Sequence, residues 1–342
     1  MNLSLELLRR CSVAVDLGAA RTRVYLKDGG LIVDQPTVAA VNTRTGSLIA
    51  VGSLAEQMTG RTPQHIRVVR PVSGGTVVDI DIAQRMLRFF VGDKVCRAWR
   101  RKPLLRAAIC VSHDADPLAR RAAAETLGGL GARRVELVDT LIAAAVGCGL
   151  PVERPEATMI VVCGATTTHI AVLSLGSIVA AEKVQVGGEI IDRAVVEYAR
   201  IRHELLLPGQ SGHPLHDALK DTDPTLGGAE VHGRDVSTGL AKSVRVDTAD
   251  VRAIVCSPLA GVLDALRAVL RRCPPDLVAD LLDRGIMVAG GSARLTGFDD
   301  LLSEGTGMPT QIAERPDLCA VEGLGAMLDG RVRPLRLDPL AR

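Results

Sequence analysis

The chain has 342 residues, and its 41 basic and 39 acidic side chains leave a formal net charge of only +2. This balance provides no field that would hold a polyanion, so the composition argues against nucleic acid as a principal partner. A hydrophobic content of 47% with 23% charged residues excludes a disordered scaffold, and a chain of this length is expected to form about two domains with a cleft between them.

Eight cysteines are scattered along the chain, and no two of them follow the CxxC spacing. Several lie inside apolar runs, so we interpret them as buried free thiols rather than metal ligands or disulfide partners. Free thiols indicate a reducing cytoplasm. The longest apolar stretch, residues 141–152, is shorter than the roughly 20 residues that cross a bilayer, and the first residues lack the layout of a secretion signal.

In the first half of the chain, apolar patterns predict strands over 11–17, 22–27, 31–34, 37–42 and 48–52, and then over 105–111 and 134–138. Helical patterns lie between them at 82–91 and 117–127, and Pro117 suits the first turn of a helix. Strands that alternate with amphipathic helices predict an α/β fold.

The second half repeats this architecture, though not its sequence. A helix over 140–148 ends before two prolines, and the elements that follow are strands over 158–163, 167–173 and 178–186 and a helix over 189–202. Residues 207–230 are rich in Gly, Pro and Asp and are interpreted as an irregular excursion with one short helical pattern, HDALKD. The remaining predicted elements are a helix over 248–272, a strand over 285–289 and helices near 299–305 and 318–328.

Two hairpins carry the strongest functional signal. Residues 13–25 read VAVDLGAARTRVY and residues 159–172 read MIVVCGATTTHIAV, and each combines an apolar strand, a tight turn of small residues and a second strand. Glycine lets a backbone approach phosphate closely, so two such turns facing each other predict a nucleotide clamp. The glycines of the predicted cradle are Gly18, Gly164, Gly187 and Gly188. The alternative is a pair of tight hairpins without a ligand.

With the late turn GGSARLTG at 290–297, these hairpins resemble the actin and chaperone-kinase superfamily, and the chain resembles its bacterial MreB family over about residues 12–328. The segments that carry the resemblance are DQPTVAAVNTRTGSLIAVGSLAEQMTGRTPQHIRVVRPVSGGTVVDIDIAQRMLRFF, AVLSLGSIVAAEKVQVGGEIIDRAVVEY and CPPDLVADLLDRGIMVAGGSARLTGFDDLLSEGTGMP.

The resemblance implies an actin-like two-lobe fold of the actin, chaperone and sugar-kinase superfamily, with four subdomains around a cleft for ATP and Mg²⁺. Lobe I would comprise residues 1–140 and 318–342, with a small subdomain at about 32–72. Lobe II would comprise residues 141–317, with a small subdomain at about 181–245.

The family's first phosphate loop reads DLGTANT, and this chain has DLGAART. Ala19 lacks a hydroxyl group, and Arg21 replaces an asparagine. An arginine here would either hold a phosphate through charge-assisted hydrogen bonds or stand in solvent. The resemblance assigns Arg21 to the cofactor site with the matching residues Asp16, Gly18, Ala20 and Thr22, and it makes Asp16 a weak metal ligand.

The family's second loop, DIGGGTTE, corresponds to residues 162–169. Val162 replaces the carboxylate that would hold the metal's water shell, and a hard cation binds oxygen rather than an alkyl group. Mg²⁺ binding would therefore be weakened. Gly164 is kept, but Ala165 and Thr166 add Cβ atoms where the backbone approaches phosphate, which narrows the pocket.

Hydrolysis requires a residue that orients the attacking water, and the family places a glutamate for this role in IEEPMAAA. The matching segment here is VDTLIAAA, in which Thr140 replaces the glutamate. Asp139 keeps an acid one residue earlier, but adjacent residues point in different directions. With Thr140 and Val162 both degenerate, the resemblance implies no intact catalytic residue and at most a weak ATPase.

The adenosine side of the site is better kept. A strand-to-helix turn supplies a compact surface for a nucleotide, formed by Gly290, Gly291, Ser292 and Ala293. The family's ribose-contacting Glu and Lys match His213 and His216 when apolar positions are aligned, or Asp217 and Lys220 in a shifted register. The seven histidines show no metal-ligand spacing, so a zinc site is not expected.

Two segments are candidates for contact with the inner membrane surface. Leu3 and Leu7, followed by Arg9 and Arg10, form either a short amphipathic anchor or a frayed terminus. Trp99 stands among basic residues in RAWRRKP, which suits an anionic lipid surface. The alternative is a solvated loop in which Trp99 covers the edge of the core.

The resemblance thus implies an actin-like cytoskeletal protein that binds ATP and polymerises into membrane-associated filaments, which take part in cell-shape control and guide cell-wall synthesis. It would assemble with itself or with an intact MreB relative, in the cytoplasm at the inner face of the cell membrane, near cell-wall elongation proteins. The alternative is a nucleotide-free scaffold that co-assembles with an intact relative. A sugar-kinase activity is disfavoured because no carboxylate base stands at the matching positions.

Overall fold

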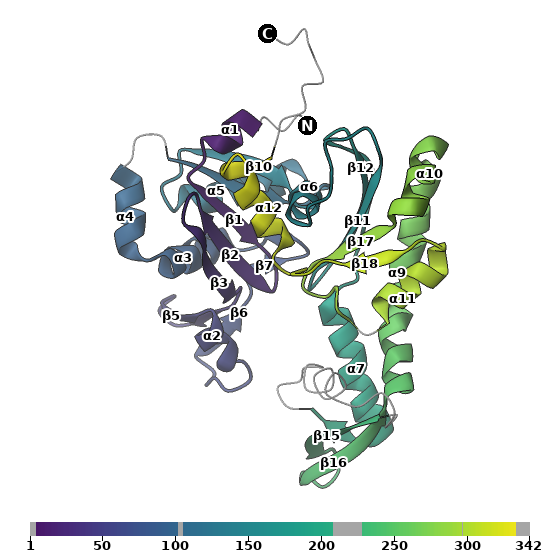
Figure 1. Cartoon of the computed structure of the whole chain (residues 1–342). Helices are drawn as coiled ribbons and strands as arrows, with labels where there is room; N and C mark the ends of the chain where they lie inside the picture. Colours follow the sequence, from purple (N-terminus) through teal and green to yellow (C-terminus); the bar gives the residue numbers. More distant parts are fainter. Residues whose placement is uncertain (1–4, 102–104, 208–227, 296, 333–342) are drawn as a thin grey trace.

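The computed structural model describes residues 5–101, 105–207, 228–295 and 297–332. Two five-stranded sheets lie side by side with helices packed around them, and a small three-stranded sheet lies at the lower end of each half (Figure 1). A two-stranded sheet in the first half is formed by β7 (Val72–Ser73) and β8 (Thr76–Val77). The predicted α/β class is confirmed.

The first large sheet, called here the N-terminal sheet, has the strand order β10-β9-β1-β2-β3. The first three strands in sequence form an antiparallel meander, and β9 and β10 run parallel to β1. The strands are β1 (Val13–Leu17), β2 (Arg21–Leu26), β3 (Gly30–Pro36), β9 (Arg106–Val111) and β10 (Arg134–Asp139).

The second large sheet, called the C-terminal sheet, has the order β13-β12-β11-β17-β18. Its meander is followed by two parallel strands on the side of β11, so its topology repeats that of the N-terminal sheet strand for strand. This confirms the predicted duplication of architecture. The strands are β11 (Thr158–Cys163), β12 (Thr168–Ser174), β13 (Ser177–Val184), β17 (Ile286–Ala289) and β18 (Thr310–Ile312).

Helices α6 (Thr140–Gly147) and α12 (Cys319–Leu328) form a tightly packed pair that contacts both large sheets (Figure 1). The two backbones approach so closely that a Cβ on Gly147 would lie 1.8 Å from the carbonyl oxygen of Cys319. A Cβ on Gly323 would lie 1.8 Å from the carbonyl oxygen of Ala143. Glycine at these two positions is therefore a packing requirement of the junction between the sheets.

The other helices cover the outer faces of the sheets. Among the described helices, α9 has the length and apolar composition to cross a bilayer, but its stripe of Val251, Val255, Leu259 and Val262 is 0–1% exposed and packs in the core. We therefore assign α9 to the core of the second half. The bounds are α3 (Ile80–Val91), α5 (Pro117–Gly128), α7 (Gly188–His203), α9 (Thr248–Arg272), α10 (Pro275–Arg284) and α11 (Phe298–Thr306).

The two small sheets have the orders β5-β4-β6 and β14-β15-β16. Residues 207–230 were predicted to be irregular, but residues 228–230 form the start of β15. The predicted helical pattern HDALKD lies outside the described residues. The elements are β4 (Ala39–Asn42), β5 (Leu48–Val51), α2 (Ser53–Gln57), β6 (Ile66–Val69), β14 (Leu205–Leu206), β15 (Gly228–Asp235) and β16 (Ala241–Asp247).

Trp99 does not face a membrane surface, so the predicted lipid contact through this residue is wrong. The segment is a helix, α4 (Asp93–Arg101), and Trp99 is 4% exposed in the core of the first half. Cys96 lies one turn earlier on the same buried face, while Arg97 and Arg100 are exposed. Helical periodicity thus turns the indole inward and the cations outward.

The N-terminal segment begins, in the described part, with α1 (Leu5–Arg9). Leu8 is 2% exposed and packs with Leu324 and Met327 of α12, and Leu7 is half-buried. Leu3 lies outside the described residues. All eight cysteines lie inside the described ranges, and the predicted burial holds for five of them, whereas Cys110, Cys148 and Cys256 are only partly buried.

Candidate functional site

The two predicted phosphate turns are closed by the same type of backbone hydrogen bond. The Gly18 N–H donates a hydrogen bond to the Arg21 carbonyl at 3.0 Å, and the Gly164 N–H donates to the Thr167 carbonyl at 2.9 Å. Each bond closes a four-residue turn between two antiparallel strands, β1 and β2 in one case and β11 and β12 in the other. The duplicated architecture therefore extends to the turns themselves.

A buried threonine supports each turn from inside. The Thr22 hydroxyl lies 2.8 Å from that of Thr37, which donates to the Gly18 carbonyl at 2.7 Å. At the equivalent position of the second turn, the Thr168 hydroxyl donates to the Val186 carbonyl at 2.7 Å. Both Thr22 and Thr168 are 0% exposed. The first links its hairpin to Thr37, and the second links its hairpin to the segment before α7.

The second turn lies against the start of α7. The Gly188 N–H and the Ser292 hydroxyl both donate to the Gly164 carbonyl, each at 3.0 Å. A Cβ on Gly187 would lie 2.6 Å from the backbone of Ala165. The structure therefore brings together three segments that the sequence assigned to one site.

The turn after β17 joins the same cluster. Gly290 has a φ of +94°, and a Cβ there would lie 2.2 Å from the Cys163 carbonyl oxygen, which also accepts from the Ser292 N–H at 3.1 Å. At Gly291 a Cβ would meet no atom within 4 Å, so this position is open. Ala293 is 0% exposed in the core and supports the turn from below.

Ala165 connects the second turn to the first half of the molecule. Its side chain packs against the core cluster of the N-terminal sheet, a cluster that includes Ala19 of the first turn. Ala20 is exposed, and Thr166 is half-buried. The second turn therefore lies against the core of the first half, next to the cluster that contains Ala19 of the first turn.

Asp16 and Val162 occupy equivalent positions, each two residues before the glycine of its turn. Strand alternation places both on the faces that look toward α6 and α12, since Ala14 and Val162 belong to the clusters formed with those helices. The side chain of Asp16 is 15% exposed, and burial raises the pKa of its carboxyl group, an effect that Arg23 partly opposes. Val162 is 8% exposed in an apolar cluster.

Arg23 is a buried cation beside Asp16. Its Nη1 lies 3.9 Å from Asp16 Oδ2, its Nε lies 3.3 Å from Asp34 Oδ1, and its Nη2 lies 3.0 Å from Asp317 Oδ2. Arg21, which the sequence placed on a phosphate or in solvent, is paired through Nε with Asp34 Oδ1 at 2.6 Å. Two arginines thus share the carboxylates around the first hairpin.

This arrangement does not fit a bound divalent cation. Such an ion takes several oxygen ligands, but Asp16 is already next to a guanidinium group and Val162 offers only methyl groups. Within the described ranges, no group of three or more His, Cys, Asp or Glu side chains is placed to hold a metal. The predicted weak metal site at Asp16 therefore gains no support from the geometry.

The residues at the start of α6 have structural partners. The Thr140 hydroxyl donates to the Val111 carbonyl at 3.0 Å. Asp139 caps the helix by accepting from the Leu141 N–H at 2.8 Å, and its other oxygen lies 3.0 Å from His113 Nδ1. Both Asp139 oxygens are thus engaged, so this acid does not take over the task of the missing glutamate.

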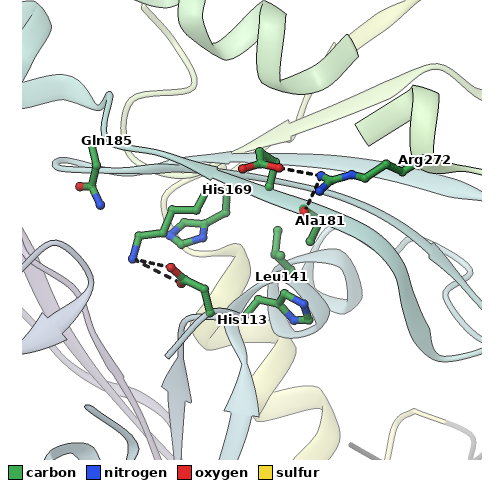
Figure 2. A pocket seen from close by; sticks show the side chains of 9 residues that line it. His113, Leu141, His169, Ala181, Gln185 and Arg272 are labelled. Carbon is green, nitrogen blue, oxygen red and sulfur yellow. Dashed lines mark hydrogen bonds and ion pairs between the residues drawn. The ribbon is translucent and has the colours of Figure 1, made fainter. Parts of the chain in front are cut away.

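A polar cavity of about 320 Å³ lies near this helix start, between the loop after β9 and the strands β12 and β13 (Figure 2). An ion pair crosses it from one half of the molecule to the other, with Lys183 Nζ 3.1 Å from Asp114 Oδ2. Arg272 pairs with Glu182 at its far wall. The cavity is lined by His113, Asp114, Leu141, His169, Ala181, Glu182, Lys183, Gln185 and Arg272.

His169 gives the protein a defined sensitivity to acid. It is 8% exposed, and burial, assisted by the neighbouring Lys183, lowers the pKa of its imidazole to about 4. Because an unfolded histidine titrates near pH 6.5, the unfolded chain binds an extra proton between about pH 4 and 6.5. The contribution of His169 to the free energy of unfolding therefore falls by about 2 kcal/mol as pH drops from 7 to 4.5.

We expect the His169→Gln variant to lack this pH-dependent part of the free energy of unfolding when urea unfolding is measured at pH 7 and pH 4.5. The exposed His232→Gln variant is the control and should keep the wild-type pH dependence. Equal losses of stability in wild type and His169→Gln would contradict the assignment.

Two parts of the site were not predicted from sequence. Arg23 was overlooked, although a charged residue at an inward position of a strand is a usable signal. The Lys183–Asp114 pair was not accessible, because its partners meet only through the tertiary fold. His213 and His216, with the alternatives Asp217 and Lys220, lie outside the described residues.

Comparisons with known proteins agree with this architecture. Residues 10–335 match the family model of the MreB/Mbl protein. The chain is 34% identical over 323 residues to the cell shape-determining protein MreB of Escherichia coli (strain K12), covering 93% of each chain.

Solved structures show the same fold. The crystal structure of MreB 5 of Spiroplasma citri bound to AMPPNP superposes with a TM-score of 0.83 at 26% identity, covering 91% of this chain and 93% of that one. The MamK double helical filament gives a TM-score of 0.73 at 20% identity over 94% and 99% of the two chains, which supports the fold alone. The chain therefore belongs to the MreB/Mbl protein family and has its actin-like fold.

Proposed function

We propose that the chain is an actin-like cytoskeletal protein that binds ATP between its two hairpin turns and assembles into filaments that take part in cell-shape control. The observation that carries this proposal is the pair of turns closed by the same hydrogen bond, at Gly18 and at Gly164. The nucleotide would contact Gly188 at the start of α7 and Gly291 in the turn after β17. The AMPPNP-bound relative and the cell shape-determining relative support it.

Hydrolysis in this proposal is weak or absent. Thr140 and Val162 replace the acids that the family uses, and the Thr140 hydroxyl is engaged with a backbone carbonyl. Mg²⁺ would be held poorly, because Asp16 is paired with Arg23. The filament would therefore depend on nucleotide binding rather than on turnover.

The proposed lobes follow the two large sheets. Lobe I comprises residues 1–140 and 318–342, and lobe II comprises residues 141–317. The small sheets would form the small subdomains, with β13 belonging to the large sheet of lobe II. We further propose a place at the inner membrane surface, to which the N-terminal segment around Leu7 would contribute, and assembly with itself or an intact relative near cell-wall elongation proteins.

One observation favours a second function, a nucleotide-free scaffold that co-assembles with an intact relative. The Ala165 side chain packs against the core of the first half, which includes Ala19 of the first turn. A site closed in this way would keep the filament contacts without the ligand.

The open position at Gly291 allows a sharp test. A Gly291→Glu variant places a negative charge in the turn assigned to the adenosine side of the site, where an added Cβ meets no atom within 4 Å. This charge opposes the anionic nucleotide, so we expect ATP affinity to fall at least about tenfold and pelleting with ATP to be lost. Gly291→Ala is the matched control and should bind and sediment like wild type. Calorimetry and sedimentation, with and without lipid vesicles, measure both effects.

Three outcomes separate the functions. ATP-dependent pelleting of wild type supports the first proposal. Assembly with an intact relative without any ATP binding supports the scaffold. A wild-type protein that stays monomeric under every condition contradicts both.

A further inference from the structure

We propose that the nucleotide site of this chain works without a bound divalent cation, because Arg23 takes the place of the metal's charge beside Asp16. The inference rests on the proposed nucleotide binding and specifies its ligand as the metal-free form of a nucleoside di- or triphosphate. It is carried by the position of the buried Arg23 guanidinium group. It is also carried by Val162, the aliphatic residue that occupies in the second hairpin the position of Asp16 in the first.

The charges of the site support this inference. Two carboxylates at the ends of β1 and β11 would carry two negative charges, which a divalent cation neutralises. In this chain Val162 removes one of those charges, and Arg23 places a positive charge 3.9 Å from the carboxylate that remains. Asp16 therefore has a positively charged neighbour in the protein itself, without a metal ion.

Arg23 is buried among carboxylates in this position. It is 6% exposed, and its nitrogen atoms also approach Asp34 of β3 and Asp317 of the loop before α12. Asp34 is shared with Arg21, and Asp317 is half-exposed, so water screens part of its charge. The guanidinium group thus has carboxylates within 4 Å on three sides, one of them, Asp317, through a hydrogen bond.

A divalent cation at Asp16 would meet this fixed positive charge. Like charges a few ångströms apart repel strongly in a partly buried site. The cation would also find no oxygen ligand on Val162, so neither charge nor coordination favours it. The Arg23 charge and the missing ligand at Val162 both disfavour a metal ion, so nucleotide binding is expected to be independent of it.

The test compares ATP affinity in excess EDTA and in excess Mg²⁺, measured by calorimetry on the wild-type chain. We expect the two dissociation constants to agree within about threefold. Binding seen only with Mg²⁺ would overturn the inference and leave the proposed function intact. If circular dichroism shows a folded protein and ATP binds in neither buffer, the proposed function and this inference are both overturned.

Substitutions of Arg23 test whether this residue is responsible for ATP binding without a metal ion. Arg23→Lys keeps the charge and should bind ATP in EDTA like wild type, whereas Arg23→Leu should bind at least about tenfold more weakly in EDTA. The double variant Arg23→Leu with Val162→Asp should bind Mn²⁺ alone, detected by electron paramagnetic resonance, while wild type should not. Tight Mn²⁺ binding by wild type would contradict the inference without reliance on any variant's stability.

Discussion

Changing three side chains together is expected to raise ATP turnover at least about a hundredfold above that of the wild-type chain. The changes are Thr140→Glu, Val162→Asp and Arg23→Leu. Thr140→Glu supplies the group that orients the attacking water, Val162→Asp supplies the second carboxylate, and Arg23→Leu frees Asp16 for a metal ion. Phosphate release at saturating Mg²⁺ and ATP measures the effect.

The pair Thr140→Glu with Val162→Asp is expected to stay near the wild-type rate. In that variant Arg23 still lies beside Asp16 and opposes the metal, so the water-orienting acid has no activated phosphate to act on. The matched control is Arg23→Leu with Val162→Asn and Thr140→Gln, which has side chains of the same shape without the carboxylates. It should be inactive.

Two results would contradict this account. A wild-type chain that already hydrolyses ATP as fast as the triple variant would show that Thr140 and Val162 are not the limiting positions. A pair variant as active as the triple variant would show that Arg23 does not exclude the metal. Because Val162 is buried among apolar side chains, each variant's unfolding temperature must be recorded beside its rate.

The second large effect is expected at the helix junction. Gly323→Ala should lower the free energy of unfolding by about 3 kcal/mol, because overpacking forces backbones apart where they already touch. The added Cβ would lie 1.8 Å from the Ala143 carbonyl oxygen and 2.8 Å from the Gly147 nitrogen, and neither backbone atom can rotate away. Urea unfolding of the purified protein measures the loss.

The control is Gly128→Ala at the end of α5, where a Cβ would meet no atom within 4 Å. Alanine favours a helix over glycine, so this variant should be unchanged or more stable by up to about 1 kcal/mol. Equal stability of Gly323→Ala and wild type would mean that α6 and α12 are free to separate, and that the junction between the sheets is looser than described.

Local patterns were sufficient to predict the elements around the site. The hairpins at Gly18 and Gly164 combine apolar alternation with small turn residues, and helices such as α5 begin with a capping acid and a proline. Short strands that depend on distant partners, such as β6 and β18, were missed. Their pairing is fixed by strands far away in the sequence.

The failures at the site have a similar cause. Trp99 was a candidate for lipid contact because its neighbours in sequence are cations, with burial at the edge of the core as the alternative. Helical periodicity gives α4 a buried face of two residues and favours the alternative. Arg23 was passed over because its partner Asp317 lies far along the chain. A sequence gives the residue types near a turn, but which of them pair depends on strand register and on the loop before α12.

The most direct measurement is a crystal structure of the protein grown with ATP and Mg²⁺. We predict an intact triphosphate whose phosphates lie beside Gly18 and Gly164, with Arg23 still within reach of Asp16 and no metal ion on that carboxylate. An empty space between the hairpin turns, or ADP with a cation bound to Asp16, would contradict the account.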